Sequence, residues 1–596
     1  MDNRVEPTQI SSGDKLSDIE HHFRVSAGPG SGKTHWLVNH IKKVLHTSKR
    51  LDKSRKVACI TYTNTAVEII RDRLGSSANQ VEVSTIHSFL YRHIIKPYMH
   101  FIADDFNFDI SRLDGHEDMY ISKGVIIEWL NDHSKKSDFK HPYSINQLTK
   151  NPDSLERLYK WLSSISYEFD DNRNLIVIAD ARKSFARGSR LKDKCIELLE
   201  VDLYKFKKQF WKKGILHHDD VLFFSYQLVS RFPFILSILR AKFPYFFIDE
   251  FQDSNPIQVE LLRRIGEQET IVGIIGDKAQ SIFNFQGADP SQFEAFSLEG
   301  IKDYRINNNR RSTKQIIGFL NHIRPDFKQL GQDSFTGSKP VIYIGERLDV
   351  LKAINDTLSE EGLVTLSYKN ITANALKKDI EGIDLNERLL KDLREVDNSN
   401  RTKLIIPCIK AVELCRENKI KEALKELKKY FGRSEQGKKD ALKLLLLINS
   451  KYDEYCFGPL MTFYNLLKAE SGIEKLSNFK AGRPKNFYDD TNYQDLALCV
   501  NIAEDTSNNI TIHKSKGAEF KNVLLVLDNQ NELDFIICPK LDQDEKHRLR
   551  YVAASRAIKN LFITVPEINE TKAKNINGLG LVDIIRIDNG IQLITS

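Results

Sequence analysis

Short apolar runs without polar alternation recur in two separated zones of the chain. Such runs, which end at Gly, Asp or Thr, are typical of strands buried on both faces of a parallel sheet. The first zone contains 23–27, 57–62, 245–248 and 271–275, and the second contains 523–527 and 561–565. Leu37, Ile41 and Val44 then lie on one stripe, which predicts a helix after the first run. The pattern predicts an α/β fold built from strand–loop–helix units, as in nucleotide-binding cores.

Two stretches of different character interrupt these zones. Residues 97–214 are rich in Lys, Asp, Ser and Tyr and show helical periodicity without a comparable strand run. Residues 381–504 have the pattern of short amphipathic helices. Within them, 410–443 holds 11 Lys and Arg against 6 Asp and Glu, most of the chain's positive excess. This basic segment is either a solvated helical face or a surface for phosphates or a partner.

Composition narrows the class of protein without identifying a function. The 596 residues include 33 Phe and 41% hydrophobic residues, which excludes global disorder and predicts several domains. The formal net charge of +7 permits a nucleic-acid partner but does not require one. We find no apolar run long enough to span a bilayer, no signal-peptide core and no CxxC pair among 7 scattered cysteines. These features predict a reduced, cytoplasmic, multidomain protein without a membrane partner.

A phosphate-binding loop follows the first predicted strand. Small residues let backbone N–H groups curl around a phosphate, and the next helix begins there with its positive dipole end. Lys33 would bridge the β- and γ-phosphate oxygens, and the Thr34 hydroxyl would ligate Mg²⁺. The loop residues before them are Gly28, Pro29, Gly30, Ser31 and Gly32.

A pair of carboxylates follows another predicted buried strand, 245–248. Asp249 is placed to hold Mg²⁺ through water, and Glu250 to orient or deprotonate the attacking water. A strand ending in an acidic solvated loop would also produce this pattern, but the phosphate loop makes that alternative a poor explanation. Together the two motifs predict hydrolysis of a nucleoside triphosphate.

Further blocks resemble the UvrD/Rep/PcrA group of superfamily 1 DNA helicases. The blocks occur in the family's order: ITYTNTAVEIIRDRL (60–74), VSTIHSFL (83–90), HHDDVL (217–222), DEFQDSNPIQ (249–258), GDKAQSIFNFQGA (276–288), RINNNRRST (305–313), LSYKN (366–370), ITIHKSKGAEF (510–520) and HRLRYVAASRA (547–557). The resemblance implies two RecA-like parallel-sheet domains, each with a mainly helical insertion. The implied ranges are 1–96 with 215–300 for the first domain, 97–214 for its insertion, 301–380 with 505–596 for the second domain, and 381–504 for its insertion.

The resemblance also implies a set of nucleotide contacts, with ATP and Mg²⁺ as cofactors. Gln280 resembles the family's γ-phosphate sensor, and Arg311 and Arg556 match its two arginines that neutralise the charge of the transition state. Glu519 is at the position of the ribose contact, and Arg310 replaces the tyrosine that stacks on adenine. Gln9 is a weaker match to the adenine-reading glutamine because its spacing to the loop is loose.

Single-stranded or tailed duplex DNA is the substrate that the resemblance implies. Aromatic faces stack on bases without regard to sequence, whereas hydroxyl and amide groups bind phosphates. The matching ring positions are Tyr62, His87, Phe283, Phe285 and His513, and the phosphate-binding positions are Thr63, Asn64 and Thr511. Core packing is the other explanation for Phe283 and Phe285.

Two functions therefore remain open from the sequence. One is an ATP-driven single-stranded DNA translocase and helicase with the family's 3′ to 5′ direction. The other is a DNA-sensing regulatory ATPase that controls a partner nuclease and unwinds little, which is favoured by Gln286 in place of the family's arginine and by the short second insertion. Together with IIKPY (94–98), that short insertion resembles the helicase-like subunit of the Gabija anti-phage system. This resemblance implies an OLD-family nuclease as partner.

Overall fold

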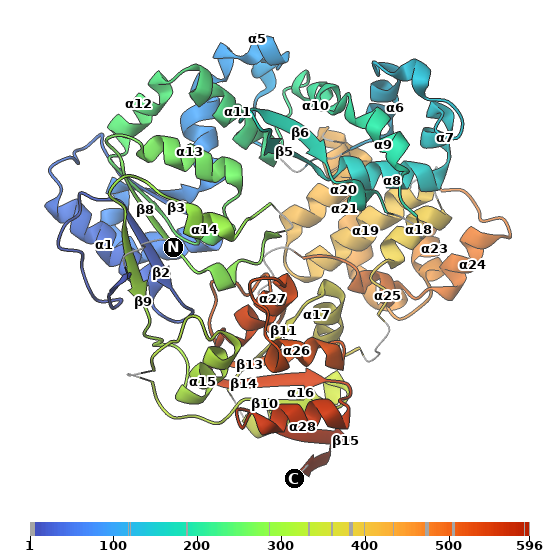
Figure 1. The fold of residues 1–596 in the computed structure, drawn as a ribbon. Coiled ribbons are helices and arrows are strands. Elements are labelled where there is room, and N and C mark those ends of the chain that lie inside the picture. Colours follow the sequence, from blue (N-terminus) through green and yellow to red (C-terminus); the bar gives the residue numbers. More distant parts are fainter. Residues whose placement is uncertain are drawn as a thin grey trace. The chain divides into compact units, whose positions relative to one another are not determined.

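The chain forms two compact units that divide between Arg310 and Arg311 (Figure 1). The computed structural model describes residues 6–116, 119, 121–185, 189–284, 287–331, 334–358, 361–380, 385–397, 400–432, 434–470, 476–502, 507–588 and 591–594. Each unit contains one insertion and one β-sheet, parallel throughout in the first unit and parallel except for one edge strand in the second, and the fold is α/β as predicted. The division lies later than the expected boundary between 300 and 301, because strand β9 (Lys302–Ile306) pairs within the first sheet.

The first sheet has seven parallel strands in the order β1-β9-β2-β8-β7-β3-β4. The four apolar runs of the first zone all form central strands, as expected. Besides β9, the strands are β1 (Thr8–Gln9), β2 (Phe23–Ala27), β3 (Val57–Thr61), β4 (Val81–Thr85), β7 (Tyr245–Ile248) and β8 (Ile271–Gly276).

Helices cover both faces of this sheet, and alternate residues of each strand feed the two cores. One face packs against α1 (Lys33–Thr47) and α2 (Asn64–Leu74), and the other against α11 (His218–Arg231), α12 (Phe234–Lys242) and α13 (Pro256–Gly266). In β7, Tyr245 and Phe247 enter the first core, whereas Phe246 and Ile248 enter the second. The predicted helix after the first strand is α1, with Leu37, Ile41 and Val44 buried.

The first insertion is mainly helical but also contains a β-hairpin, which the sequence pattern did not predict. The hairpin pairs β5 (Ile165–Phe169) with β6 (Leu175–Ala179), and Asp170 closes its turn by accepting from the Asn174 amide at 2.7 Å. β6 is a continuous apolar run, LIVIA, that the sequence analysis overlooked, whereas β5, ISYEF, contains polar residues and shows no such run. The helices are α5 (Ala103–Phe106), α6 (Lys123–Asn131), α7 (Ile145–Lys150), α8 (Pro152–Leu162), α9 (Asp193–Glu200) and α10 (Leu203–Trp211).

A buried ionic cluster joins this insertion to the first α/β domain. Asp220 on α11 accepts hydrogen bonds from Tyr167 Oη on β5 and from Trp211 Nε1 on α10, and it pairs with Lys207 Nζ at 2.8 Å. Both members of the ion pair are almost fully buried. Burial alone would raise the pKa of Asp220, but the Lys207 ammonium and His217 hold it below its usual range. The carboxylate therefore stays charged and fixes three segments to one another.

The second sheet has the order β12-β11-β13-β14-β10-β15-β16, parallel except for β16. Its strands are β10 (Val341–Ile344), β11 (Leu363–Ser367), β12 (Asn509–Thr511), β13 (Phe520–Val526), β14 (Ala557–Val565), β15 (Asp583–Asp588) and β16 (Ile591–Ile594). Its helices include α15 (Lys314–Ile323), α16 (Arg347–Leu358), α17 (Asn370–Lys377), α26 (Asp534–Ile537), α27 (Glu545–Ala554) and α28 (Glu570–Gly578). Both apolar runs of the second zone lie in β13 and β14, as predicted.

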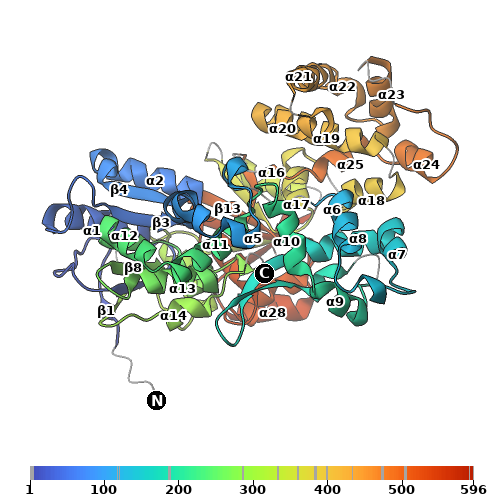
Figure 2. The same cartoon turned by 90° about the horizontal axis from the view of Figure 1, so that it is seen from above.

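The second insertion is helical in its described residues and packs around its own apolar core (Figure 2). The helices are α18 (Leu389–Val396), α19 (Asn400–Arg416), α20 (Ile420–Phe431), α21 (Glu435–Ser450), α22 (Tyr452–Tyr455), α23 (Leu460–Glu470), α24 (Arg483–Asp490) and α25 (Tyr493–Leu498). Glu413 on α19 is buried and accepts from Tyr452 Oη at 3.1 Å, Tyr493 Oη at 3.0 Å and Lys378 Nζ at 2.6 Å. Since Lys378 follows α17, this cluster ties the insertion to the second sheet domain.

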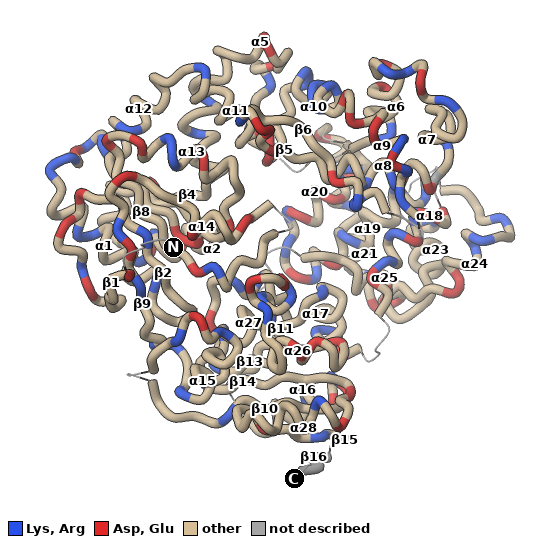
Figure 3. Tube along the Cα trace, viewed as in Figure 1, with Lys and Arg blue, Asp and Glu red and all other residues tan. Residues whose placement is uncertain are grey.

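The basic segment lies on α19, α20 and α21, where several lysines are exposed and others form short-range pairs. Lys429 pairs with Glu426 at 2.6 Å, for example. Lys and Arg alternate with Asp and Glu along much of the trace in Figure 3. Both interpretations of the basic segment stay open.

In the residues that the structure describes, no single helix is long and apolar enough to cross a membrane. The bent pair α11 and α12 passes the same test of length and composition when taken together, with a 107° angle between its helices. Most apolar side chains of this pair lie in the core of the first unit.

Candidate functional site

The phosphate loop joins the end of β2 to the start of α1 at the carboxyl edge of the first sheet. Gly30 and Gly32 have φ angles of 69° and 80°, in the left-handed region that favours glycine. A Cβ on Gly32 would also lie 2.8 Å from Ser12 Cβ, so the N-terminal segment restricts this position further. The Arg310 amide donates to Gly30 O at 2.9 Å, which places the end of the first unit on the loop.

Lys33 and Thr34 begin α1 and face the acidic end of β7. Lys33 is 9% exposed, and its Nζ donates to Ala27 O at 3.4 Å across the loop. Thr34 Oγ1 donates to Asp249 Oδ2 at 3.2 Å. A threonine hydroxyl beside a carboxylate supplies the hard oxygen ligands that Mg²⁺ prefers, so these two residues fit that ion.

Asp249 and Glu250 follow β7 directly, and Asp249 is buried. Burial, with the neighbouring Glu250 carboxylate, raises the pKa of Asp249 above its usual value. Glu250 has a φ of 56°, an unfavourable left-handed conformation for a residue with a Cβ. The backbone amide of Glu250 donates to Asp249 Oδ1 at 3.0 Å, so the strained turn also fixes the Asp249 carboxylate.

A relay of amide and carboxyl groups connects Glu250 to Gln280 through two residues that sequence analysis did not select. Gln252 Nε2 donates to Glu250 Oε2, and Gln252 Oε1 accepts from the Asp277 amide at 2.9 Å. Gln280 Nε2 then donates to Asp277 Oδ2 at 2.6 Å. Gln252 and Asp277 are buried polar residues just beyond β7 and β8, and polar residues at these strand ends are the sequence signal that could have identified them. The relay joins the acid pair to the proposed phosphate sensor.

Two of the predicted ring positions of the first unit form one ring pair. Tyr62 and Phe283 stack with centroids 4.6 Å apart and an interplanar angle of 25°. Phe283 is largely covered, and burial raises the pKa of Tyr62. Phe285 and Gln286 lie outside the described residues.

The remaining predicted DNA contacts of this unit lie at two helix starts. Thr63 caps α2 by accepting from the Ala66 amide at 3.2 Å, and Asn64 is exposed in the first turn. His87 on α3 (Ile86–Leu90) lies beside His116 and His218, whose Nδ1 atoms are 2.7 Å apart. Burial lowers the pKa of His87 to about 3, so its ring is neutral near pH 7. Within the described part of the chain, no group of three or more His, Cys, Asp or Glu side chains is arranged to hold a metal ion.

The second unit brings Arg311, Glu519 and Arg556 together. Arg311 donates to Glu519 Oε1 at 2.6 Å and to Ser555 O at 2.7 Å. Arg556 is buried and donates to Val552 O at 3.1 Å and to Ala518 O at 3.4 Å. Both guanidinium groups are thus oriented by their own unit, and Glu519 holds the first of them.

Thr511 and His513 lie at the end of β12 in the second unit. Thr511 is buried, whereas His513 is partly exposed with its ring 6.4 Å from that of Tyr368. Tyr368 is 45% exposed and follows β11, within a block that the sequence analysis matched without selecting this ring. The two adjacent strand ends therefore place a tyrosine and a histidine beside a threonine.

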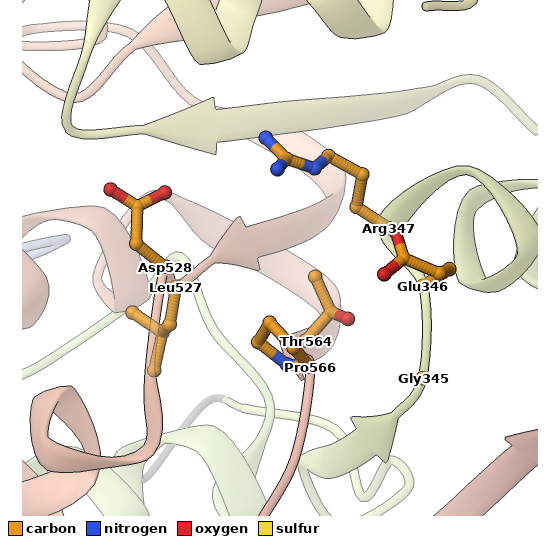
Figure 4. A pocket seen from close by; sticks show the side chains of 7 residues that line it. All are labelled: Gly345, Glu346, Arg347, Leu527, Asp528, Thr564 and Pro566. Atoms are coloured by element: carbon orange, nitrogen blue, oxygen red, sulfur yellow. The ribbon is translucent and has the colours of Figure 1, made fainter. Parts of the chain in front are cut away.

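A polar pocket, here called the second-sheet pocket, lies at the carboxyl edge of the second sheet (Figure 4). It is formed by residues at or just beyond the ends of β10, β13 and β14, together with the first residue of α16. The lining residues are Gly345, Glu346, Arg347, Leu527, Asp528, Thr564 and Pro566. Asp528 also pairs with Lys369 Nζ at 3.0 Å.

Comparison with known proteins agrees with this geometry. Two family models match the chain: the UvrD/REP helicase N-terminal domain over residues 12–299 and the UvrD-like helicase C-terminal domain over residues 376–567. A probable DNA helicase II homolog of Mycoplasma genitalium is 25% identical, with 94% of this chain and 85% of that protein covered. The ATP-dependent DNA helicase PcrA of Staphylococcus aureus is 24% identical, with 92% and 82% covered. The Gabija protein GajB of Bacillus cereus is also 24% identical, with 90% and 92% covered.

Proposed function

We propose that this chain, which belongs to the UvrD/Rep family of ATP-dependent DNA helicases, moves along single-stranded DNA in the 3′ to 5′ direction. The observation that carries the proposal is the contact between Thr34 and Asp249, because it joins the phosphate loop to the acid pair in one site. A protein that only bound DNA would have no use for this site.

In the proposed reaction, the first unit binds and activates the triphosphate. Loop amides and Lys33 bind the phosphate oxygens, and Glu250 orients the attacking water and accepts its proton. Mg²⁺, held by Thr34 and by Asp249 through water, would neutralise charge on the phosphates. The relay through Gln252 and Asp277 would report the γ-phosphate from Gln280 to Glu250.

The second unit would supply the positive charge that the transition state needs. Arg311 and Arg556 are fixed by carbonyl oxygens and Glu519, so little reorganisation would be needed when the triphosphate arrives. We propose that hydrolysis changes how these arginines engage the nucleotide, and that this change moves the DNA. Arg310 and Glu519 would contact the adenine and ribose.

Single-stranded DNA would be bound by groups in both units. In the first, Tyr62 would stack with a base and the largely covered Phe283 would support its ring, and Thr63 and Asn64 at the start of α2 would bind phosphates, with His87 alongside. In the second, Thr511, His513 and Tyr368 would serve the same strand. Phe285 is proposed as a further stacking ring from its sequence position.

The test is steady-state ATP hydrolysis by the purified chain with and without oligo-dT. We expect strong stimulation by the oligonucleotide and a fall of at least about 100-fold in Lys33→Ala, which removes a group bound to the phosphates. Arg347→Ala is the matched control, since Arg347 begins α16 of the second sheet as Lys33 begins α1 of the first. Hydrolysis indifferent to DNA would reject the translocase.

A second candidate is a regulatory ATPase that senses DNA and controls a partner nuclease of the OLD family, as part of anti-phage defence. It is favoured by the similarity to GajB over almost the whole of both chains. Strand displacement on a 3′-tailed duplex, with and without such a nuclease, separates the candidates. Efficient unwinding by the isolated chain would reject a purely regulatory role.

A further inference from the structure

Ser555, which follows α27 directly, contacts both arginines of the second unit. Its backbone carbonyl accepts from Arg311 Nη1 at 2.7 Å, and its hydroxyl oxygen accepts from Arg556 Nη2 at 3.0 Å. The same hydroxyl donates to Val552 O at 2.7 Å, which fixes its orientation. Ser555 is fully buried, so water cannot take the place of these groups. One serine therefore joins Arg556 to an arginine that lies 244 positions earlier than Ser555 in the chain.

The carboxyl end of α27 is a favourable place for two cations. The last carbonyl groups of a helix have no partner within the helix, and they carry partial negative charge. Val552 O accepts from Arg556 Nε at 3.1 Å, and Ser555 O accepts from Arg311, so each arginine satisfies one carbonyl at this end. The helix thus orients both guanidinium groups by hydrogen bonds and by its dipole.

A second connection between the arginines runs through Ala518 and Glu519. Ala518 O accepts from Arg556 Nη1 at 3.4 Å, and Glu519 Oε1 accepts from Arg311 Nη2 at 2.6 Å. The next residue, Phe520, begins β13, and its amide donates to Arg556 O at 3.0 Å, so the strand fixes this segment. The Glu519 side chain is 51% exposed and that of Arg311 only 10%. Glu519 is therefore the most accessible member of the group.

The accessible carboxylate can serve a sugar and an arginine at once. A carboxylate has two oxygens with several acceptor sites, so Glu519 can accept from a ribose hydroxyl while Oε1 holds Arg311. The sugar would then restrict the carboxylate, and the carboxylate would restrict the guanidinium group behind it. Better positioning of a group that acts in the transition state raises kcat, whereas uniform binding lowers only KM.

We infer that Glu519 and Ser555 are positioning residues that hold Arg311 and Arg556 as one unit, and that a ribose hydroxyl bound at Glu519 speeds hydrolysis through them. The inference rests on the proposed role of the two arginines in neutralising the transition state. Ser555 would then serve hydrolysis without touching the nucleotide, and the sugar would determine kcat as well as affinity.

The first experiment compares hydrolysis of ATP, 2′-deoxy-ATP and 3′-deoxy-ATP without DNA. We expect the analogue that lacks the contacting hydroxyl to lower kcat at least about fivefold. In Glu519→Gln, kcat for ATP should fall at least about tenfold, because a neutral amide holds a guanidinium group less strongly than a carboxylate does. The analogues should then be hydrolysed within about twofold of ATP. Glu361→Gln, which changes an exposed glutamate paired with Lys559 at 2.8 Å, is the matched control and should keep the sugar preference.

The second experiment changes the serine. Ser555→Ala removes the hydroxyl that orients Arg556, so kcat should fall at least about tenfold while KM stays within about twofold. Ser555→Thr keeps a hydroxyl and should restore kcat to within about threefold of the unmodified chain. Ser515→Ala is the matched control, because Ser515 is an equally buried serine of the same unit whose hydroxyl donates to Ile512 O at 2.7 Å. Its kcat should equal that of the unmodified chain.

Double variants test whether each residue acts through its arginine. Glu519→Gln in an Arg311→Ala chain, and Ser555→Ala in an Arg556→Ala chain, should each lower kcat by less than about twofold further. Losses that multiply in both pairs would overturn the inference, and so would a sugar effect confined to KM. Since all these rates are measured without DNA, a chain that follows the pattern but ignores oligo-dT would reject the translocase and leave the positioning role intact.

Discussion

The carboxyl edges of the two parallel sheets differ in what they can hold, although their strands follow the same order. The first sheet can be written β4-β3-β7-β8-β2-β9 and the second β12-β11-β13-β14-β10-β15. These six strands of one sheet thus have counterparts in the other at the same place and in the same chain order, whereas β1 and the antiparallel β16 have none. Since β2 and β10 are counterparts, the phosphate loop after β2 and the second-sheet pocket after β10 occupy equivalent positions.

The difference lies in a short connection. Five residues, 28–32, separate β2 from α1, whereas Gly345 and Glu346 alone separate β10 from α16. Two residues cannot curl several amides around a phosphate, and one of the two, Glu346, is itself negatively charged. The common scaffold therefore provides the position, and the loop decides whether a triphosphate can bind there.

The largest expected effect comes from changing Glu250, which follows β7 in the sheet that has the phosphate loop. Glu250→Gln should slow single-turnover ATP hydrolysis at least about 1000-fold, near 4 kcal/mol, because the attacking water loses its base. Nucleotide affinity should stay within about twofold, since the phosphate-binding groups are untouched. Asp528→Asn, at the equivalent end of β13, should leave hydrolysis without DNA unchanged. A loss of hydrolysis in Asp528→Asn would break the comparison.

The two insertions offer a second comparison, because each is tied to its sheet domain by a buried carboxylate. Asp220 accepts from one lysine and two aromatic side chains, and so does Glu413. Their lysines differ, since the Lys207 side chain is 3% exposed and that of Lys378 is 25% exposed. Water can solvate Lys378 if its partner is neutralised, but it cannot reach Lys207.

Asp220→Asn should therefore destabilise the first unit by about 3 kcal/mol, because it leaves the Lys207 charge buried without its partner. Glu413→Gln should destabilise the second unit by about 1 kcal/mol. All four tryptophans, at 36, 129, 161 and 211, lie in the first unit, so tryptophan fluorescence during urea unfolding reports that unit. Hydrogen exchange of the α19 amides reports the second unit. Equal losses of stability in the two variants would show that the burial of the lysine does not set the cost of removing its carboxylate.

Sequence pattern predicted four inner strands of the first sheet and two of the second, but it missed β9, β10 and β11, which also have a neighbouring strand on each side. Strands β3, β7, β8 and β13 are buried on both faces over most of their length and read as apolar runs. β9 is only partly buried, and its sequence KDYRI contains three charged residues. Its place in the first sheet comes from pairing with β2, which no local pattern records.

The same distinction applies to the site. Contiguous motifs predicted the loop and the acid pair, because the residues of each are adjacent in the sequence. The relay needs Gln252 and Asp277, which follow different strands and meet only in the folded sheet. Ser12 against Gly32 and Tyr167 against Asp220 are likewise contacts between segments distant in sequence.

A third comparison concerns α1 and α16, the helices that follow the two equivalent strands. His40 lies seven positions after the first residue of α1, Ile354 lies seven positions after the first residue of α16, and both side chains are buried. The His40 ring stacks on Trp36 with an interplanar angle of 3°, and neither of its nitrogens has a hydrogen-bond partner among the described residues. Burial lowers the pKa of His40 from 6.5 to about 3.

The last expected effect follows from this histidine and concerns acid stability. Folded His40 stays neutral while the unfolded chain gains a proton below pH 6.5, so stability falls as the pH drops from 6.5 towards 3. His40→Leu should remove about 1.4 kcal/mol of the loss between pH 7.5 and 5.5, measured by tryptophan fluorescence in urea. The pKa of His87 is also lowered to about 3, so His87 causes a second loss of stability at low pH, which remains in His40→Leu. An unchanged difference between the two pH values in His40→Leu would mean that the ring is protonated inside the fold. The second unit, with Ile354 at this position, should show no corresponding change in the hydrogen exchange of α16.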